Sequence, residues 1–166
     1  MFMKDIKKLK PNSKGPFVQG YYKVNNPEKY AGDPRVVIFR SSWERKFMIL
    51  CDLTPQITRW GSEPVKIKYI SPIDHKEHIY NVDFFIEVLD NDNKINRYIV
   101  EIKPSNQISK EPILEGRVTE KKLIRHAELT KMYHVNKAKQ IAAMRWALDR
   151  NMKYVVLTEE NWPFTR

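Results

Sequence analysis

Two strand-like runs joined by a short polar turn constrain the fold of this chain more than any other feature. Apolar and polar side chains alternate over residues 78–90 and again over residues 94–103, with Asn, Asp and Asn at 91–93 between them. This pattern predicts an antiparallel hairpin. Pairing across such a turn joins residues whose numbers sum to about 184, which places Asp83 opposite Glu101.

Residue parity within the hairpin predicts which side chains share a face. Val82 and Phe84 are expected to point together toward the core, so Asp83 between them faces the other way. On the second strand, Glu101 and Lys103 are two residues apart and project from one face. The hairpin is therefore expected to gather two carboxylates and a lysine on the same side of the sheet.

Helical and strand-like patterns surround this hairpin. A serine-capped amphipathic pattern predicts a helix over about residues 42–52, with Glu44 in its first turn. A helical pattern resumes near Thr119 and is expected in two pieces that meet near Tyr133. Further short strands are expected at residues 57–61, 65–70 and 153–159. This order predicts an α/β domain over residues 41–166, in which helices flank a mixed β-sheet.

The first 40 residues differ from the rest in composition. Prolines and glycines interrupt residues 1–40 too often for long regular structure, and nine basic side chains stand against three acidic ones. This segment is expected to form an extended basic N-terminal arm, which Tyr21, Tyr22 and Tyr30 could attach to the body.

The charge balance favours a polyanionic partner. The chain has 30 Lys and Arg against 20 Asp and Glu, and the excess lies at the two ends, while residues 41–104 hold nine basic and ten acidic side chains. Basic ends around a nearly neutral centre suit a protein that binds nucleic acid, although solubilising surface charge is the alternative. No segment approaches the roughly 20 apolar residues that span a bilayer. A single cysteine, Cys51, excludes an internal disulfide.

The clustered carboxylates and lysine suit phosphodiester hydrolysis. Mg²⁺ takes oxygen ligands, usually one or two carboxylates completed by water and phosphate, and it can polarise a phosphoryl oxygen. A nearby lysine can orient or deprotonate the attacking water and stabilise negative charge in the transition state. Ordinary cross-strand ion pairs on an exposed face are the alternative explanation.

The residues that carry this pattern resemble a known superfamily. A helix with Glu44, Asp83 in the hairpin, and Glu101-Ile102-Lys103 before a basic helix resemble the PD-(D/E)XK nucleases. The runs SSWERKFMILCD, NVDFF, YIVEIKP and YHVNKAKQIAAMRWALDRNMKYVVLTEE are similar to the head completion nucleases of T4-type tailed phages, and also to the N-terminal catalytic domain of Tn7-type transposon-end endonucleases. The resemblance covers roughly residues 38–160 and implies a restriction-endonuclease-like core.

The resemblance also implies roles for individual residues. Asp83 and Glu101 would be the central metal ligands, the backbone carbonyl of Ile102 would complete the site, and Lys103 would be the catalytic lysine. Glu44 would support a second metal ion or a water bound to the metal.

Two residues of the later helix receive a role in the same way. Asn136 and Lys139, three residues apart, would point toward substrate phosphate on the DNA. Val82 stands where the superfamily name has proline, a position at which proline is often missing in these nucleases.

The implied function is that of a Mg²⁺-dependent deoxyribonuclease, with Mn²⁺ able to substitute, that cuts double-stranded DNA as an endonuclease, an exonuclease or both. It would act in phage head completion and head–tail joining by trimming packaged DNA, with portal, neck or tail proteins as partners and no membrane. Its expected location is the cytoplasm of the infected bacterial host or the head–tail junction of the virion. The alternatives are a transposon-end type endonuclease, and a non-catalytic DNA-binding neck or adaptor protein.

Overall fold

A four-stranded mixed sheet lies at the centre of the computed structural model, which describes residues 18–108 and 110–161. Its strands follow the order β3 (Ile57–Ser62), β6 (Phe84–Leu89), β7 (Ile95–Ile102) and β8 (Lys153–Leu157). Strand β6 is antiparallel to its neighbours β3 and β7, and β8 is parallel to β7. The fold is thus an α/β domain with a mixed sheet, as the sequence predicted.

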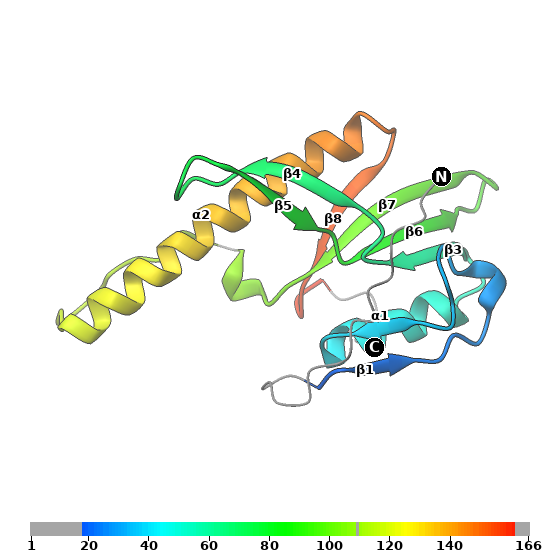
Figure 1. The fold of residues 1–166 in the computed structure, drawn as a ribbon, viewed down its shortest axis with the longest axis horizontal. Coiled ribbons are helices and arrows are strands. Elements are labelled where there is room, and N and C mark those ends of the chain that lie inside the picture. Colours follow the sequence, from blue (N-terminus) through cyan, green and yellow to red (C-terminus); the bar gives the residue numbers. More distant parts are fainter. Residues whose placement is uncertain (1–17, 109, 162–166) are drawn as a thin grey trace.

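One helix covers each face of this sheet (Figure 1). Helix α1 (Ser42–Leu53) packs on one face, and α2 (Glu120–Leu148) lies on the other. Neighbouring residues of β7 point into different cores, because Val100 packs with the α1 side and Ile99 with the α2 side. Both faces of β7 are therefore buried, including the face that carries Glu101.

Helix α1 forms where its cap predicts it. The Ser41 hydroxyl accepts a hydrogen bond from the backbone N–H of Glu44 at 3.1 Å, which satisfies one of the free N–H groups of the first turn. Phe47 and Met48 then point into the core with Phe84 of β6. The helix ends at Leu53, one residue beyond the predicted boundary.

The prediction of a single strand over residues 78–90 was wrong. It is two strands in different sheets: β5 (Glu77–Asn81) pairs with β4 (Lys66–Ile70) in a separate hairpin, and β6 begins only at Phe84. The strand is interrupted at Val82 and Asp83. The β4–β5 hairpin lies outside the central sheet and packs against α2 (Figure 1).

This break also changes the environment of Val82. Val82 lies in the core on the α2 side, whereas Phe84 lies in the core on the α1 side. The prediction that they share a face is therefore wrong. The alternation of apolar residues continues through this irregular segment, so no local pattern indicates where one strand ends and the next begins.

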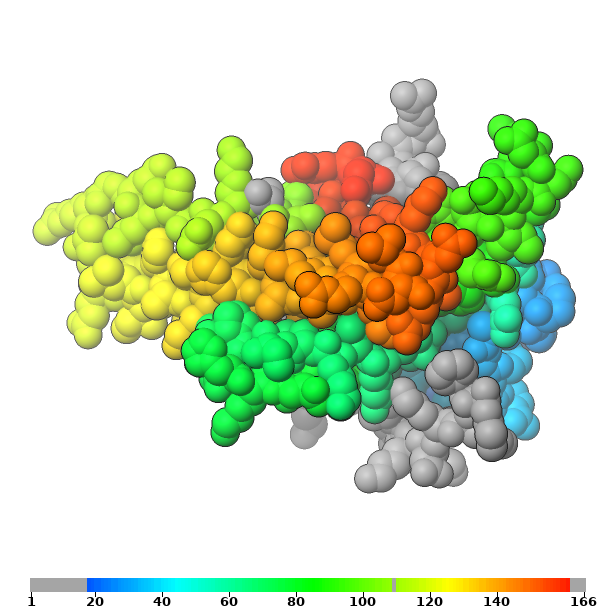
Figure 2. Space-filling model, turned by 90° about the horizontal axis from the view of Figure 1, so that it is seen from above, coloured from blue at the N-terminus to red at the C-terminus, as the bar shows by residue number. Residues whose placement is uncertain are grey.

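The later helix was expected in two pieces, but α2 is one helix of 29 residues and Tyr133 lies inside it. Its second half packs beside the β4–β5 hairpin, where Ala143 and Ala147 are buried, while its first half extends away from the body (Figures 1 and 2). The apolar stripe changes near Tyr133 because packing ends there, and the backbone continues unbroken. Within the described segments, none of the helices is long and apolar enough to cross a membrane.

Residues 18–40 fold onto the body. They form β1 (Gly20–Tyr22), the short helix η1 (Pro27–Lys29) and β2 (Val37–Phe39), and the last residue of each strand is buried in the core with α1. The remaining part of the predicted arm, residues 1–17, lies outside the described residues.

Candidate active site

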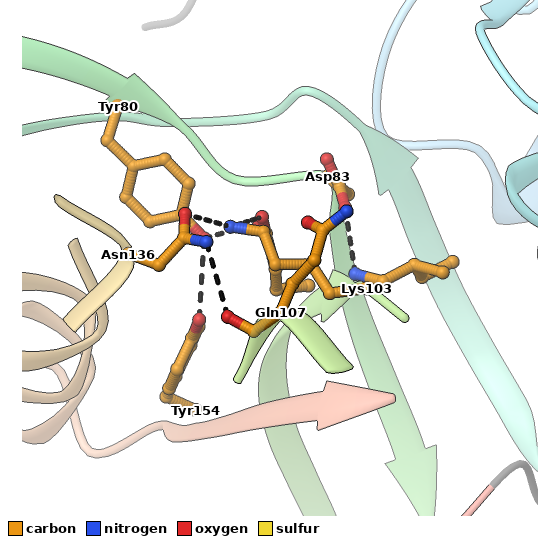
Figure 3. Close-up of polar contacts among 8 residues, drawn as sticks. Tyr80, Asp83, Lys103, Gln107, Asn136 and Tyr154 are labelled. Carbon is orange, nitrogen blue, oxygen red and sulfur yellow. Dashed lines mark hydrogen bonds and ion pairs between the residues drawn. The ribbon is translucent and has the colours of Figure 1, made fainter. Parts of the chain in front are cut away.

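The strand register agrees with the predicted placement of Asp83, which directly precedes β6, opposite Glu101. Phe84 pairs with Val100, so the next position along places Asp83 across from Glu101. The Asp83 carboxylate reaches the neighbouring strand, where its Oδ2 accepts a hydrogen bond from the backbone N–H of Ile102 at 2.8 Å (Figure 3). Asp83 is thus held against the strand that carries the Glu-x-Lys sequence.

Glu101 and Lys103 share a face, as their spacing predicted, and they form an ion pair. Lys103 Nζ lies 2.9 Å from Glu101 Oε1, and the two side chains are only 16% and 6% exposed. Removing both charges from water is costly, so this pair differs from the solvated cross-strand ion pairs considered as the alternative. A burial of this kind is typical of a functional site.

Negative charge accumulates around Asp83. Burial and the nearby carboxylate of Glu101 raise the pKa of Asp83 well above its usual range, and Glu44 contributes in the same direction. The hydrogen bond from Ile102 and the charge of Lys103 oppose this increase without cancelling it. A cation between the carboxylates would relieve their repulsion.

Helix α2 contributes two residues near the lysine. Asn136 is buried; its Oδ1 accepts a hydrogen bond from Lys103 Nζ at 3.0 Å, and its Nδ2 donates to the backbone carbonyl of Gln107 at 3.4 Å (Figure 3). Lys139 Nζ lies 5.6 Å from the ring centre of Tyr80. Burial and the positive charge of Lys103 lower the pKa of Lys139. The structure therefore places Asn136 in hydrogen-bond contact with Lys103, and it places Lys139 beside the site.

Two tyrosines that sequence reasoning missed lie on the other side of Glu101. The hydroxyl of Tyr80, from β5, donates to Glu101 Oε2, and the hydroxyl of Tyr154, from β8, lies 3.5 Å from that of Tyr80 (Figure 3). Burial first, and then the charge of Glu101, raise the pKa of both phenols, so both remain protonated. Parity along β8 could have placed Tyr154 on this face, because Tyr154 pairs with Ile99 of β7.

Glu44 lies in the first turn of α1, and the structure does not bring it together with Asp83 and Glu101 as a third metal-binding carboxylate within the described residues. Its Oε2 accepts from the backbone N–H of Arg40 at 2.8 Å, and its Oε1 accepts from the Ser41 hydroxyl at 3.0 Å. These contacts close a capping arrangement around the helix start. Burial raises the pKa of Glu44. Glu44 is close enough to raise the pKa of Asp83, while its carboxylate oxygens serve the helix cap.

The oxygen atoms at this site suit a hard divalent cation. Across residues 18–108 and 110–161, no group of three or more Asp, Glu, His or Cys side chains comes together as a metal cluster. The two carboxylates that the structure brings together here are those of Asp83 and Glu101. Two carboxylates are the usual protein contribution to a Mg²⁺ ion that keeps water or phosphate in its other positions.

A mixed sheet with a helix on each face, and an Asp and a Glu-x-Lys meeting on adjacent strands, defines a restriction-endonuclease-like fold. The sequence model of the TnsA-like endonuclease N-terminal family matches residues 54–159, and the chain belongs to this family. It is also similar to the head completion nuclease of Enterobacteria phage T4, with 30% identity over 141 residues, which are 85% of this chain and 91% of that protein. No solved structure matches the chain significantly.

These two findings confirm the predicted resemblance and support a nuclease role for the chain. The match to the phage protein extends over most of both chains, so the similarity is not confined to the Glu-x-Lys segment.

Proposed function

We propose that this protein is a Mg²⁺-dependent deoxyribonuclease that hydrolyses phosphodiester bonds in double-stranded DNA, with Mn²⁺ able to substitute. The observation that carries this proposal is the meeting of Asp83, Glu101 and Lys103 in one largely buried cluster. Surface ion pairs do not require such burial, whereas a metal-dependent hydrolase needs paired carboxylates and a cation beside them.

The metal would be held by Asp83, Glu101 and the carbonyl of Ile102. When bound, Mg²⁺ would polarise a phosphoryl oxygen of the substrate and lower the pKa of the attacking water. The hydrogen bond from the Ile102 N–H to Asp83 fixes one carboxylate relative to the strand that supplies the other ligands. The protein thereby orients the ligands before the metal binds.

Lys103 would act on the phosphate or on the attacking water. Two of its three ammonium protons can be directed to Glu101 Oε1 and Asn136 Oδ1, which leaves the third for a substrate oxygen. A lysine held in this way would stabilise the negative charge that develops on the phosphate. Asn136 would then act through Lys103, and Lys139 would contact DNA phosphate from α2.

Glu44 would add a further carboxylate from α1. It would support a second metal ion or an ordered water, and it contributes to the negative charge around Asp83. Each of its oxygens accepts one hydrogen bond, from the Arg40 N–H or the Ser41 hydroxyl, and keeps a lone pair for such a ligand.

The similarity to a head completion nuclease supports a phage role. We propose that the protein acts in head completion and head–tail joining by trimming packaged DNA, in contact with portal, neck or tail proteins. It would do so in the cytoplasm of the infected bacterial host or at the head–tail junction. A transposon-end endonuclease is the second candidate, because the matching family model is named after such an enzyme.

A cleavage assay tests the proposal. Supercoiled and linear double-stranded DNA would be incubated with Mg²⁺, Mn²⁺ or EDTA and the wild type, Asp83→Ala, Lys103→Ala or the control Asp92→Ala, which changes an exposed carboxylate in the same hairpin. We expect metal-dependent cutting by the wild type and the control, and loss of cutting in the two site variants. Nicked or linear products from circles would identify an endonuclease.

One outcome of this assay would contradict the proposal. If the wild type binds DNA but does not cut it with either ion, the nuclease proposal is wrong and the protein is a DNA-binding adaptor.

A further inference from the structure

The two carboxylate oxygens of Glu101 have different partners from different elements. Oε1 pairs with Nζ of Lys103, which directly follows β7, and Oε2 accepts a hydrogen bond from the hydroxyl of Tyr80 on β5 (Figure 3). We propose that Tyr80 is a positioning residue of the nuclease site, which holds the Glu101 carboxylate in the orientation that binds the metal. This inference rests on the proposed function.

The position of the Tyr80 hydroxyl is fixed by packing. Tyr80 is only 4% exposed and lies in the core with Ile67 of β4, Ile99 of β7 and Ala143 of α2. A phenol has two side-chain torsions and a rigid ring, whereas a glutamate has three torsions, so a buried tyrosine can restrict the carboxylate it contacts. Lys103 alone would allow that carboxylate to turn about its ion pair.

The break between β5 and β6 makes this contact possible. If residues 78–90 formed one strand, Tyr80 would continue along the central sheet in line with β6. Instead, β5 pairs with β4 outside that sheet, and the hairpin packs against α2. Tyr80 therefore reaches Glu101 from outside the central sheet, beside Lys103 and Asn136.

Tyr154 provides a matched comparison. It is a second phenol packed against the same core, and its hydroxyl lies 3.5 Å from that of Tyr80. Removing the Tyr154 hydroxyl should leave the hydrogen bond from Tyr80 to Glu101 in place. Removing the Tyr80 hydroxyl takes away the donor itself with almost no change in volume.

Metal binding to the DNA-free protein is the direct test. Titration calorimetry with Mn²⁺ would compare the wild type, Tyr80→Phe, Tyr154→Phe and Asp83→Asn as full-length chains. We expect Tyr80→Phe to weaken Mn²⁺ binding by about 10- to 100-fold, the usual effect of removing a residue that orients a metal ligand. Tyr154→Phe should bind like the wild type.

Cleavage adds a readout that a general packing defect would not give. The Tyr80→Phe defect in cleavage rate should be large at low Mn²⁺ and should disappear at saturating Mn²⁺, with an unchanged KM for DNA. Equal Mn²⁺ affinity for Tyr80→Phe and the wild type, while Asp83→Asn fails to bind, would overturn the inference. No Mn²⁺ binding by the wild type would instead contradict the proposed function, and the inference with it.

A measurement on the unaltered protein covers the case in which Tyr80→Phe does not fold. In protein labelled with ¹³C at tyrosine Cζ, Mg²⁺ should shift the assigned Tyr80 resonance in the wild type but not in Asp83→Asn. An unchanged Tyr80 resonance at Mg²⁺ saturation would overturn the positioning role.

Discussion

The carboxylate of Asp83 accepts a hydrogen bond from the backbone N–H of Ile102 at 2.8 Å, from one strand to the next. The same residue, Ile102, lies between Glu101 and Lys103, and its carbonyl is the third of the ligands we propose for the metal. Asp83 is therefore oriented by the main chain of the strand that carries the other functional groups. The spacing between the two carboxylates depends on backbone pairing, which substitutions of surface side chains leave unchanged.

Asp83→Asn should stabilise the metal-free protein while abolishing cleavage. Because burial and Glu101 raise the pKa of Asp83, the folded state holds a proton that the unfolded state releases at lower pH, and stability is lost as pH rises through the raised pKa. Asparagine avoids this loss and can still accept from Ile102. Thermal unfolding in EDTA at pH 8 should show a higher Tm for Asp83→Asn. The increase should be about 2–4 °C for each kcal/mol added to the free energy of unfolding.

The difference should shrink toward about pH 4, near ordinary carboxyl pKa values, where Asp83 of the wild type is also neutral. Asp92→Asn, in the exposed turn of the same hairpin, is the control and should leave Tm unchanged at both pH values. A lower Tm for Asp83→Asn at pH 8 would show that the carboxylate is not under electrostatic strain.

Glu44→Gln should separate the cap of α1 from a role in cleavage. Glutamine can keep both contacts, since its side-chain oxygen can accept from the Arg40 N–H and its amide group can donate to the Ser41 hydroxyl. Helix stability should therefore be retained, whereas Ser41→Ala should cost about 1 kcal/mol. If Glu44 supports a second metal ion or water, cleavage by Glu44→Gln should fall at least tenfold in a single-turnover assay, and wild-type rates would restrict Glu44 to capping.

Lys139→Ala should weaken DNA binding without abolishing metal binding. Lys139 lies beside the site, close enough for the charges of Lys103, Glu101 and Asp83 to change its pKa. Loss of one phosphate contact should reduce the slope of log K against log salt by about 1. Lys137→Ala removes an exposed lysine from the same helix and is the control. Equal salt slopes for both variants would contradict a phosphate contact specific to Lys139.

Asp52→Asn should destabilise the fold strongly without changing any residue of the candidate active site. Asp52 is fully buried and accepts from the Tyr22 hydroxyl at 2.8 Å and from the backbone N–H groups of Asn25 and Asn26 at 2.7 and 2.9 Å. Although burial alone would raise its pKa, these hydrogen bonds lower it. The contribution of Asp52 is present above the ordinary carboxyl pKa and is lost as pH falls through the lowered value.

Urea unfolding at pH 7 should show a loss of about 2–4 kcal/mol for Asp52→Asn, since charge-assisted hydrogen bonds contribute about 1.5–3 kcal/mol each. A loss below about 0.5 kcal/mol, typical of surface substitutions, would contradict a role of Asp52 in fastening residues 20–39 to α1.

Local patterns predicted the two carboxylates and the lysine of the candidate site but not the residues that surround them. Turn position and alternation fix the register of a hairpin, so Asp83, Glu101 and Lys103 could be placed on one face from the sequence. Parity does not say what covers that face. Tyr80 and Asn136 come from a separate hairpin and from a helix, and their approach depends on tertiary packing that no local period encodes.

The errors at Val82 and Tyr133 have the same origin. Alternation continues through the break between β5 and β6, so a period of two cannot reveal that the strands belong to different sheets. In α2 the apolar stripe changes where packing against the body ends, and this change suggested two helices in place of one. Hydrophobic period therefore failed in opposite ways: it continued where the chain passes from one sheet to another, and it changed inside a helix whose backbone is continuous.

Strand β7 lies inside the sheet, between β6 and β8, and carries Glu101 near its end. Interior strands open only with the whole domain, and their amides are among the slowest to exchange with solvent. Glu101 and Ile102, two of the three proposed ligands, therefore belong to the most persistent part of the molecule, while Asp83 is tied to it by its hydrogen bond with the Ile102 N–H. Heat should leave the active geometry intact up to the temperature at which the entire sheet melts, so inactivation and global unfolding should coincide.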